Sequence, residues 1–449
     1  MNVIDAVVDR KLCVGCGMCA AICPRNRLEM YWNEQGAYNP TELAYASDCP
    51  ASCSICYDTC PAHSRTKNET EIGRHLYSDI KGIKYKEQTG YYLSSYVGYS
   101  DDADHRKNGA SGGVATLLLE TLLKTGAVDS VIAVGPTADP EKLFEFRICK
   151  LPEDVRACSR SAYYPVEISD VIRHILEHEG RYAVIGLPCV CKAIRLAQAW
   201  VPRLRRRIHY VLGLTCGHQS SKFFAEYICA LTGGNPEAMK KIVFRIKDPN
   251  KPASNFGIAI YTISNEKENR VFWNDGVSDI YNSGYFQLPG CFCCDDVFAE
   301  CADATIMDAW LLEYIRDPEG NSLIIARRPE LAELCVNTSH IKPIGIERII
   351  ESQKSRIRNK RTKLFGRDTP QMRDLGGRGF IIDRLMKFEK LRIAFKSAQL
   401  WDRNLGSFQR AMSLYKWRLE FLILARSIIL VPFRIARSVI LRLHTSAKR

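Results

Sequence analysis

The sequence predicts a chain of the α/β class (α+β overall) with three parts joined by one linker. The first 65 residues contain two closely spaced runs of cysteines. Beyond about residue 96, short apolar runs alternate with stretches of helical periodicity, as in a mixed α/β sheet. Beyond about residue 346, Lys and Arg far outnumber Asp and Glu. We therefore expect a cysteine-rich domain at 1–65, a polar linker at 66–95, a mixed α/β core at 96–345 and a basic helical extension at 346–449.

Composition limits the possible functions. The chain has 449 residues, which is enough for two or three domains, and a formal net charge of +13. That excess lies entirely in roughly the last hundred residues, so the core is not a polyanion binder and we expect no nucleic-acid partner. The 19 cysteines, together with an N-terminus that lacks the pattern of a signal peptide, predict a reducing, cytoplasmic location. In such a compartment, cysteines indicate metal or redox chemistry rather than disulfides.

The two cysteine runs of the first domain have the spacing of a two-cluster ferredoxin. In that pattern three close thiolates wrap one 4Fe–4S cubane, and the fourth cysteine, followed by proline, ligates the other cubane. The pattern assigns Cys13, Cys16, Cys19 and Cys60 to one cluster, and Cys49, Cys53, Cys56 and Cys23 to the second. The second run opens with three intervening residues where two are usual, so its first cysteine departs from the pattern. Zinc ribbons are the alternative reading of these cysteines.

A second set of cysteines belongs to the core. Cys189 and Cys216 each follow an apolar, strand-like run, and Cys291, Cys293 and Cys294 follow a turn signal at Pro289 and Gly290. Thiolates are soft ligands, and a Cys-x2-Cys loop can direct two sulfurs at one iron–sulfur or zinc site. Four thiolates at strand ends and on one loop could therefore close a single metal site. The alternative is a set of separate, buried structural cysteines.

A glycine-rich turn opens a predicted helix early in the core. Residues 108–113 read Asn-Gly-Ala-Ser-Gly-Gly and precede an apolar helix at 114–123. The free N–H groups and positive dipole end of such a helix suit a phosphate or the polar edge of a flavin. The turn is neither a Rossmann fingerprint nor a phosphate-loop motif. From these residues alone, an ordinary capped turn explains the pattern equally well.

The remaining elements are predicted from hydrophobic periodicity and turn signals. A hairpin is expected in the first domain, with arms at 28–32 and 36–38. In the core we expect strands at 96–99, 131–134, 182–185, 208–212, 241–245, 257–263 and 322–326, and further helices at 166–178, 192–199 and 223–231.

The C-terminal tail has helical patterns at 351–374, 380–396 and 411–443, with basic residues interspersed. No run reaches the roughly 18 uncharged apolar residues of a membrane-spanning helix. A basic amphipathic helix on an anionic membrane surface is one interpretation, and it would place the protein peripherally on the cytoplasmic face. A helix that docks on the core or on a partner chain is the other.

Several motifs in order resemble the beta subunits of coenzyme F420 hydrogenases and dehydrogenases, a family of flavin iron–sulfur proteins that includes 7-hydroxymethyl chlorophyll a reductase. The resemblance covers roughly 1–345. It rests on Ser111-Gly112-Gly113, Arg160-Ser161-Ala162-Tyr163-Tyr164, Gly186-Leu187-Pro188-Cys189, Gly213-Leu214-Thr215-Cys216-Gly217, Gly290-Cys291-x2-Cys294, Ala302-Asp303 and Asp308-Ala309-Trp310.

The resemblance implies a ligand set for each further cofactor. It implies a third 4Fe–4S cluster held by Cys189, Cys216, Cys291 and Cys294, with Cys191, Cys293 and Cys301 left as spares. It also implies FAD beside that cluster, bound by Gly109, Ser111, Gly112, Gly113, Ser161 and Tyr163. Two departures put the familiar substrate in doubt: Ala162 stands where the family commonly has lysine, and Met307 where glycine is usual.

These patterns predict an iron–sulfur flavoprotein oxidoreductase. Electrons would pass from a ferredoxin or another redox protein through the clusters to FAD, and on to a small-molecule acceptor such as coenzyme F420. The alternative is a non-catalytic electron-transfer subunit of a larger redox complex. An iron–sulfur redox sensor is a weaker third reading, because a sensor does not need three clusters in series. The sequence assigns no catalytic acid or base, and His218 is the only histidine that we would test.

Overall fold

The structure is a computed structural model, and it describes residues 2–44, 49–50, 52–63, 66–139, 142–263, 265–282, 284 and 286–361. All of these residues belong to one compact unit, Met1–Arg378. The tail helices expected at 380–396 and 411–443, and most of the one at 351–374, lie outside the described residues. Among the helices that are described, none is long and apolar enough to cross a membrane.

The first domain folds around short helices and one hairpin. Its elements are the π-helical turn η1 (Ile4–Val8), α1 (Met18–Ala21), β1 (Leu28–Trp32), β2 (Tyr38–Glu42) and α2 (Ile55–Asp58). The expected hairpin is confirmed: β1 and β2 are antiparallel, with Leu28 opposite Glu42 and Trp32 opposite Tyr38. Apolar residues including Val3, Val7 and Leu12 pack against four of the cysteines to form the small core of this domain.

The segment expected as a polar linker contains ordered structure. It holds α3 (Glu69–Tyr77) and the short hairpin of β3 (Lys84–Lys86) and β4 (Gly90–Tyr92). A capping box starts α3, in which the Glu71 N–H donates to Asn68 Oδ1 (2.8 Å) and the Asn68 N–H donates to Glu71 Oε2 (2.9 Å). At the other end of the helix, the buried Tyr77 hydroxyl donates to the Cys301 carbonyl (3.2 Å). This segment therefore packs on the core.

The core is built on one eight-stranded mixed sheet with strand order β15-β5-β14-β13-β9-β8-β6-β7. The central strands β13, β9, β8 and β6 are parallel to one another, and the flanking strands are antiparallel to their neighbours. The strand bounds are β5 (Ser94–Gly98), β6 (Ser130–Pro136), β7 (Phe144–Cys149), β8 (Tyr182–Gly186), β9 (Ile208–Leu214), β13 (Ala304–Asp308), β14 (Ser322–Ala326) and β15 (Ile341–Pro343).

Helices cover both faces of this sheet. Because successive side chains of a strand point to opposite faces, Val184 packs with α7, α8 and α9, whereas Ala183 and Ile185 pack with α5, α6 and α13. The bounds of these and the other described helices after α3 are α4 (Ala103–Asn108), α5 (Val114–Lys124), α6 (Pro152–Ala157), α7 (Ser169–Glu177), α8 (Pro188–Trp200), α9 (Pro202–Arg207), α10 (Phe223–Leu231), α11 (Ser278–Asn282), α12 (Leu312–Ile315), α13 (Pro329–Val336), α14 (Ile346–Ser352) and α15 (Lys354–Arg361).

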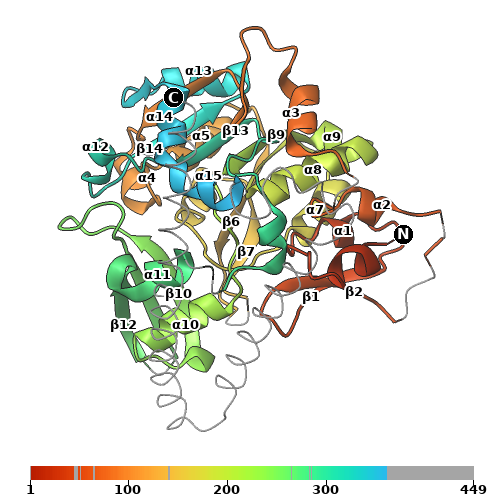
Figure 1. The fold of residues 1–449 in the computed structure, drawn as a ribbon, viewed down its shortest axis with the longest axis horizontal. Coiled ribbons are helices and arrows are strands. Elements are labelled where there is room, and N and C mark those ends of the chain that lie inside the picture. Colours follow the sequence, from red (N-terminus) through yellow and green to blue (C-terminus); the bar gives the residue numbers. More distant parts are fainter. Residues whose placement is uncertain are drawn as a thin grey trace, which may run out of the picture. The chain divides into compact units, whose positions relative to one another are not determined.

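The first domain packs on the face of α7 and α8. Val14, Met18 and Ile22 of that domain belong to the same apolar cluster as Ile172 of α7 and Ile194 of α8. Figure 1 shows the red N-terminal elements beside α7. The first cysteine loop is therefore held directly against the core.

The structure differs from the sequence expectation in several elements. The expected strands at 241–245 and 257–263 join a separate antiparallel sheet of β10 (Met239–Ile246), β11 (Gly257–Thr262) and β12 (Asn265–Phe272). In Figure 1 this sheet lies with α10 and α11, in green. Strands β7, β13 and β15 belong to the main sheet and were not expected.

The helix expected to start at residue 192 begins earlier, at Pro188. Proline is favoured at the first position of a helix, because its fixed φ suits the helix and no N–H is needed there. Cys189 therefore lies in the first turn of α8 rather than in a loop.

Candidate functional site

The structure gathers one group of four cysteines from both runs of the first domain. The thiol of Cys60 interacts electrostatically with those of Cys16 and Cys13, and Cys19 interacts with all three. Burial raises the pKa of Cys13 to about 12 and that of Cys16 to about 11. A coordinated thiol is nevertheless deprotonated, because the metal charge outweighs such a shift. This donor set fits an iron–sulfur cluster.

The other four cysteines of the first domain form a second group. Cys56 interacts electrostatically with Cys23, Cys49 and Cys53, so the last cysteine of the first run joins the second run. The Arg27 N–H donates to Cys23 Sγ (3.3 Å), as backbone amides do to cluster sulfurs. Cys49, the residue that departs from the usual spacing, is exposed.

The four cysteines expected from the core also lie near one another. Burial, and after it the thiols of Cys216, Cys16, Cys291 and Cys294, raise the pKa of Cys189 well above its usual range. Gln219 links two of the set, because its backbone N–H donates to Cys291 Sγ (3.4 Å) and its side-chain Nε2 donates to Cys189 Sγ (3.1 Å).

The fold explains why these core cysteines meet. Cys189 follows β8 and Cys216 follows β9, and these adjacent parallel strands end at the same edge of the sheet, where α/β proteins bind ligands. Cys291 lies in the 3-10 turn Pro289–Cys293, and Cys294 caps that turn. One loop therefore supplies two sulfurs and two strand ends supply one each.

The spare cysteines have other surroundings. Cys191 Sγ donates to the carbonyls of Gly186 (3.6 Å) and Leu212 (3.5 Å), so this side chain faces the sheet. Cys293 packs against the apolar cluster of the first domain, and Cys301 is fully buried. None of the three is among the thiols that most affect Cys189.

The core cysteine loop lies directly against the first cysteine run. A Cβ on Gly290 would lie 2.2 Å from the Leu12 carbonyl oxygen, so only glycine allows this approach. From the same run, the Cys16 carbonyl accepts a hydrogen bond from the Ile168 N–H (3.0 Å). Because Cys16 and Cys189 also interact electrostatically, the two cysteine groups are neighbours.

A cavity of about 240 Å³ adjoins the core cysteines. Cys216 itself lines this cavity. Of the six residues expected to bind flavin, five line it: Gly109, Ser111, Gly113, Ser161 and Tyr163. The two positions that depart from the resembled family, Ala162 and Met307, line it as well.

Gly112 and Gly113 are glycines for reasons internal to the protein. The Gly112 N–H donates to Ser322 Oγ (3.1 Å), and a Cβ there would lie 2.6 Å from the Gly98 carbonyl oxygen. Gly113 has φ +77°, and a Cβ there would lie 2.5 Å from the His105 carbonyl oxygen. A larger residue at either position would disturb the fold itself, so such substitutions do not test ligand binding.

Basic side chains hold the glycine-rich turn from outside. Arg245 Nη2 donates to the Ala110 carbonyl (2.8 Å), and Lys247 Nζ donates to the Ser111 carbonyl (2.7 Å). Arg245 also forms an ion pair with Asp308, and burial lowers the pKa of Lys247 to about 8. Arg245 belongs to β10 of the separate sheet, and Lys247 directly follows that strand. This sheet thereby fixes one wall of the cavity.

Two buried hydroxyls at the cavity have no protein partner. Thr215 Oγ1 and Ser220 Oγ are buried, and neither has a hydrogen-bond partner among the described residues. Both residues line the cavity. A buried hydroxyl without a partner costs roughly 1–3 kcal/mol, so such groups usually bind a ligand or an ordered water. The cavity therefore fits a ligand with polar edges, such as a flavin ring. His218, the one histidine singled out above, also lines the cavity and stacks on Tyr281.

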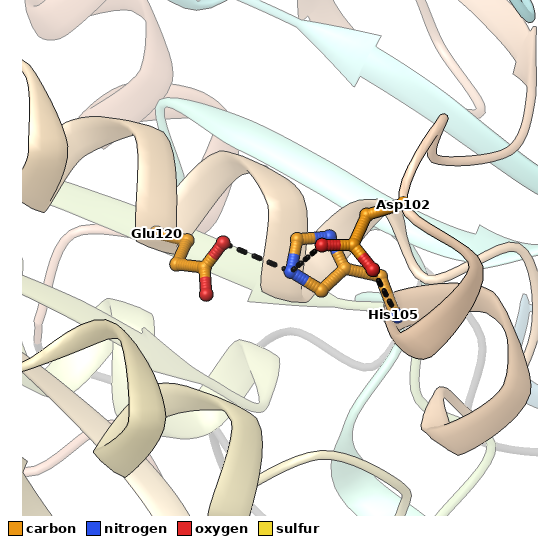
Figure 2. A group of neighbouring side chains, drawn as sticks. All are labelled: Asp102, His105 and Glu120. Carbon is orange, nitrogen blue, oxygen red and sulfur yellow. Dashed lines mark hydrogen bonds and ion pairs between the residues drawn. The ribbon is translucent and has the colours of Figure 1, made fainter.

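Asp102, His105 and Glu120 form a separate polar group that joins α4 to α5 (Figure 2). His105 Nε2 lies 2.9 Å from Glu120 Oε2, and both side chains are buried. Arg156 bridges the two carboxylates, with Nη2 2.7 Å from Asp102 Oδ2 and Nε 2.6 Å from Glu120 Oε1. Because a guanidinium already occupies both carboxylates, this group stabilises the helices around the glycine-rich turn rather than binding a metal ion.

Arg156→Ala should therefore destabilise the protein by about 2 kcal/mol, since it removes charge-assisted hydrogen bonds to the buried Glu120 carboxylate. Urea unfolding followed by circular dichroism measures the loss. Arg348→Ala is the matched control: its ion pairs with Glu313 and Glu351 are exposed to solvent and screened by it, so we expect little or no loss of stability. Equal losses in both variants would contradict a structural role for the buried group.

Sequence comparison agrees with a redox protein built from a ferredoxin-like domain and a mixed α/β core. The chain belongs to the family of coenzyme F420 hydrogenase/dehydrogenase beta subunits. Residues 95–173 match the N-terminal model of that family, and residues 179–351 match its C-terminal model. Residues 6–26 match a 4Fe–4S binding domain.

Two relatives named as redox proteins align with most of this chain. A coenzyme F420-dependent sulfite reductase of Methanocaldococcus jannaschii is 23% identical over 83% of this chain and 52% of its own length. This chain thus spans about half the length of that relative. One subunit of the F(420)H(2) dehydrogenase of Methanosarcina mazei is 25% identical over 73% of this chain and 86% of its own. A chain of the F420-reducing NiFe hydrogenase complex from Methanosarcina barkeri is 19% identical, covering 62% of this chain and 93% of its own, with a TM-score of 0.47.

Several residues of the site carry no local sequence signal. Gln219 contacts two core cysteines, Arg245 holds the glycine-rich turn, and Arg356 lines the cavity. Lys360 contacts a further core cysteine, Cys294 (3.2 Å). Only Gln219 lies near a motif, three residues after Cys216, and could have been suspected from its position.

Proposed function

We propose that the protein is an iron–sulfur flavoprotein oxidoreductase that moves electrons between a ferredoxin-like donor and a small reducible molecule of the coenzyme F420 type. One observation carries this proposal: Cys189 interacts with Cys16 of the first domain, and its neighbour Cys216 lines the cavity. The core cysteines thus stand between the first domain and a ligand-sized space. A continuous route for electrons needs this order.

The proposed ligand sets follow from the cysteine groups. Cys13, Cys16, Cys19 and Cys60 would hold one 4Fe–4S cluster, Cys23, Cys49, Cys53 and Cys56 the second, and Cys189, Cys216, Cys291 and Cys294 the third. Iron–sulfur clusters carry single electrons, and FAD exchanges electrons singly or in pairs. The cofactors supply this chemistry, and the protein positions the cofactors.

The cavity is the proposed FAD site. Its support is the pair of buried hydroxyls at Thr215 and Ser220, which would donate to or accept from the polar edge of the ring. Arg160 and Arg356 add positive charge to the lining, which suits an anionic ring or phosphate. Tyr163, which stacks on Trp273 with ring centroids 5.6 Å apart, would give an aromatic wall.

A second candidate is a non-catalytic subunit that delivers electrons to a partner enzyme. It is favoured by the Methanosarcina mazei relative, which is named as a subunit of a dehydrogenase. The two functions differ in what the chain does alone. An enzyme would reduce or oxidise a deazaflavin without any added protein, whereas a relay subunit would exchange electrons only with artificial dyes.

Anaerobic purification of the whole chain, followed by iron, sulfide and flavin analysis, tests the proposal. We expect about twelve irons, about twelve sulfides and one FAD per chain, since three 4Fe–4S clusters are assigned. Stopped-flow mixing with reduced and oxidised coenzyme F420 then separates the two candidates. Zinc in place of iron, or iron without flavin, would contradict the proposal.

A further inference from the structure

Helix α15 (Lys354–Arg361) lies beyond residue 351, where the family match ends, and yet it reaches the core cysteines. We propose that Lys360 of this helix raises the reduction potential of the cluster held by Cys189, Cys216, Cys291 and Cys294. It would do so through its positive charge and an N–H···S hydrogen bond to Cys294. The inference rests on the third cluster of the proposed function.

The contact geometry is that of a charge-assisted hydrogen bond. Lys360 Nζ lies 3.2 Å from Cys294 Sγ and 2.6 Å from the Asp296 carbonyl oxygen. The whole residue is only 8% exposed, although lysine is almost never buried without a partner. Its charge also interacts with the thiols of Cys216 and Cys291, so it acts on three of the four proposed ligands.

The surroundings of Lys360 favour negative charge on these sulfurs. Among the described residues, the hydrogen-bond partners of its ammonium are one carbonyl and one sulfur. The buried Asp296 carboxylate also interacts with it electrostatically, but no ion pair joins the two among these residues. Burial of an ammonium costs several kcal/mol. Neutral thiols add nothing to the compensation that Asp296 gives, whereas thiolates bound to a cluster do.

The helix is anchored on both sides of this lysine. Just before α15, Gln353 Nε2 donates to the Asp308 carbonyl (2.9 Å). At its last residue, Arg361 Nη2 donates to Glu300 Oε1 (2.8 Å), and both of these side chains are nearly buried. These contacts fix the backbone of α15, so the ammonium is held near Cys294 before any electron arrives.

A fixed cation changes the potential of a cluster in a definite direction. Reduction adds one negative charge to the cluster and its thiolates. A nearby ammonium therefore stabilises the reduced form more than the oxidised form, and the effect is strong because water is excluded. Hydrogen bonds to the sulfurs act in the same sense. The cluster nearest the cavity would thus be easier to reduce, which favours electrons reaching the cavity from the first domain.

Redox titration of the whole chain, followed by electron paramagnetic resonance, tests this inference. The core cluster is identified as the signal that is missing in Cys216→Ala. Lys360→Met should lower the ratio of reduced to oxidised core cluster at a fixed potential by about tenfold. For one electron this corresponds to a reduction potential lower by about 59 mV. Lys360→Arg keeps the charge and should stay within a third of that shift. Lys360→Gln keeps N–H donors without charge and should fall between the two.

Lys354→Gln is the matched control, because it removes one charge from the exposed start of the same helix and leaves the anchoring contacts of Gln353 and Arg361 in place. Its core cluster should keep the parental potential. The inference is overturned if Lys360→Met leaves the potential of a fully loaded cluster unchanged, or if Lys354→Gln shifts it equally. An absence of the third signal from the parent protein would instead contradict the proposed function. Iron loss in Lys360→Met alone would make the lysine a structural residue, and this too overturns a tuning role.

Discussion

Cys216→Ala should remove about four of the roughly twelve irons expected per chain and leave the two clusters of the first domain in place. The expectation follows from position: Cys216 is the one proposed ligand that interacts with Cys189 and also lines the cavity. Without it, the core set keeps three sulfurs and cannot close a four-cysteine site. Iron and sulfide analysis measures the loss, and the resonance signals of the first domain should persist.

Cys191→Ala is the control for this loss. Cys191 lies two residues from Cys189 on α8, but its thiol donates to the carbonyls of Gly186 and Leu212 and faces the sheet. Its removal should leave the iron content unchanged. Iron retained in Cys216→Ala, or lost in Cys191→Ala, would show that the ligand set is wrong.

The measurement needs the whole chain rather than an isolated core. Gly290, beside the core cysteines, packs on Leu12 of the first domain. Lys360, which contacts Cys294, lies beyond the C-terminal limit of the core predicted from sequence. A fragment cut at the predicted domain boundaries would lose both supports, so a low iron content in it would not test the cysteines.

The sequence predicted the parts of the site that depend on local spacing. The cysteine runs of the first domain could be recognised because one short loop must present several sulfurs to one cluster. Cys189 and Cys216 could be grouped because they follow strands, and β8 and β9 are indeed parallel neighbours. The mixed α/β class is confirmed for the same reason, since helical and strand periodicities alternate along the core.

The parts that were missed depend on contacts between distant segments. Lys360 lies 66 residues beyond Cys294 in the chain, in a charged stretch that looks like an ordinary solvated helix. Strands 241–245 and 257–263 alternate like those of the main sheet, and only their pairing with each other, and of the second with β12, separates them from it. Nothing in their own residues indicates which sheet they join.

The glycines of the site show the same difference between what local sequence predicts and what distant contacts decide. The pattern at Gly112 and Gly113 predicts a ligand-binding turn, but it does not say which atoms surround the two glycines. In the structure, the neighbouring atoms at both positions belong to the protein backbone. Among the sequence motifs, Gly217 stands only as the neighbour of Cys216. Its environment is the opposite of that of Gly112 and Gly113. Its backbone lines the cavity, and a Cβ there would be at least 3.7 Å from any described heavy atom outside its chain neighbours.

Gly217→Leu should therefore lower the FAD content of the protein at least about tenfold while leaving the fold and the iron content intact. The new side chain would extend into space that the ring is proposed to occupy, and overlap of a well-packed group costs roughly 1–3 kcal/mol. Its first atom would meet Arg356 Nε at 3.7 Å and the Tyr281 hydroxyl at 3.8 Å, which are ordinary contacts. Flavin released by acid and measured by fluorescence gives the content, and iron analysis of the same sample reports the clusters.

Gly345→Leu is the matched control, because Gly345 is exposed before α14 and does not line the cavity, and a Cβ there would meet no described atom within 4 Å. It should keep full flavin and full iron. Flavin retained in Gly217→Leu, with unchanged affinity on titration of the deflavinated protein, would place FAD elsewhere. Loss of flavin and iron together would mean that the loop after β9 had collapsed, and the cavity would then need to be tested at Thr215. There Thr215→Val removes only the unpartnered hydroxyl, and it should weaken FAD binding about tenfold at full iron content.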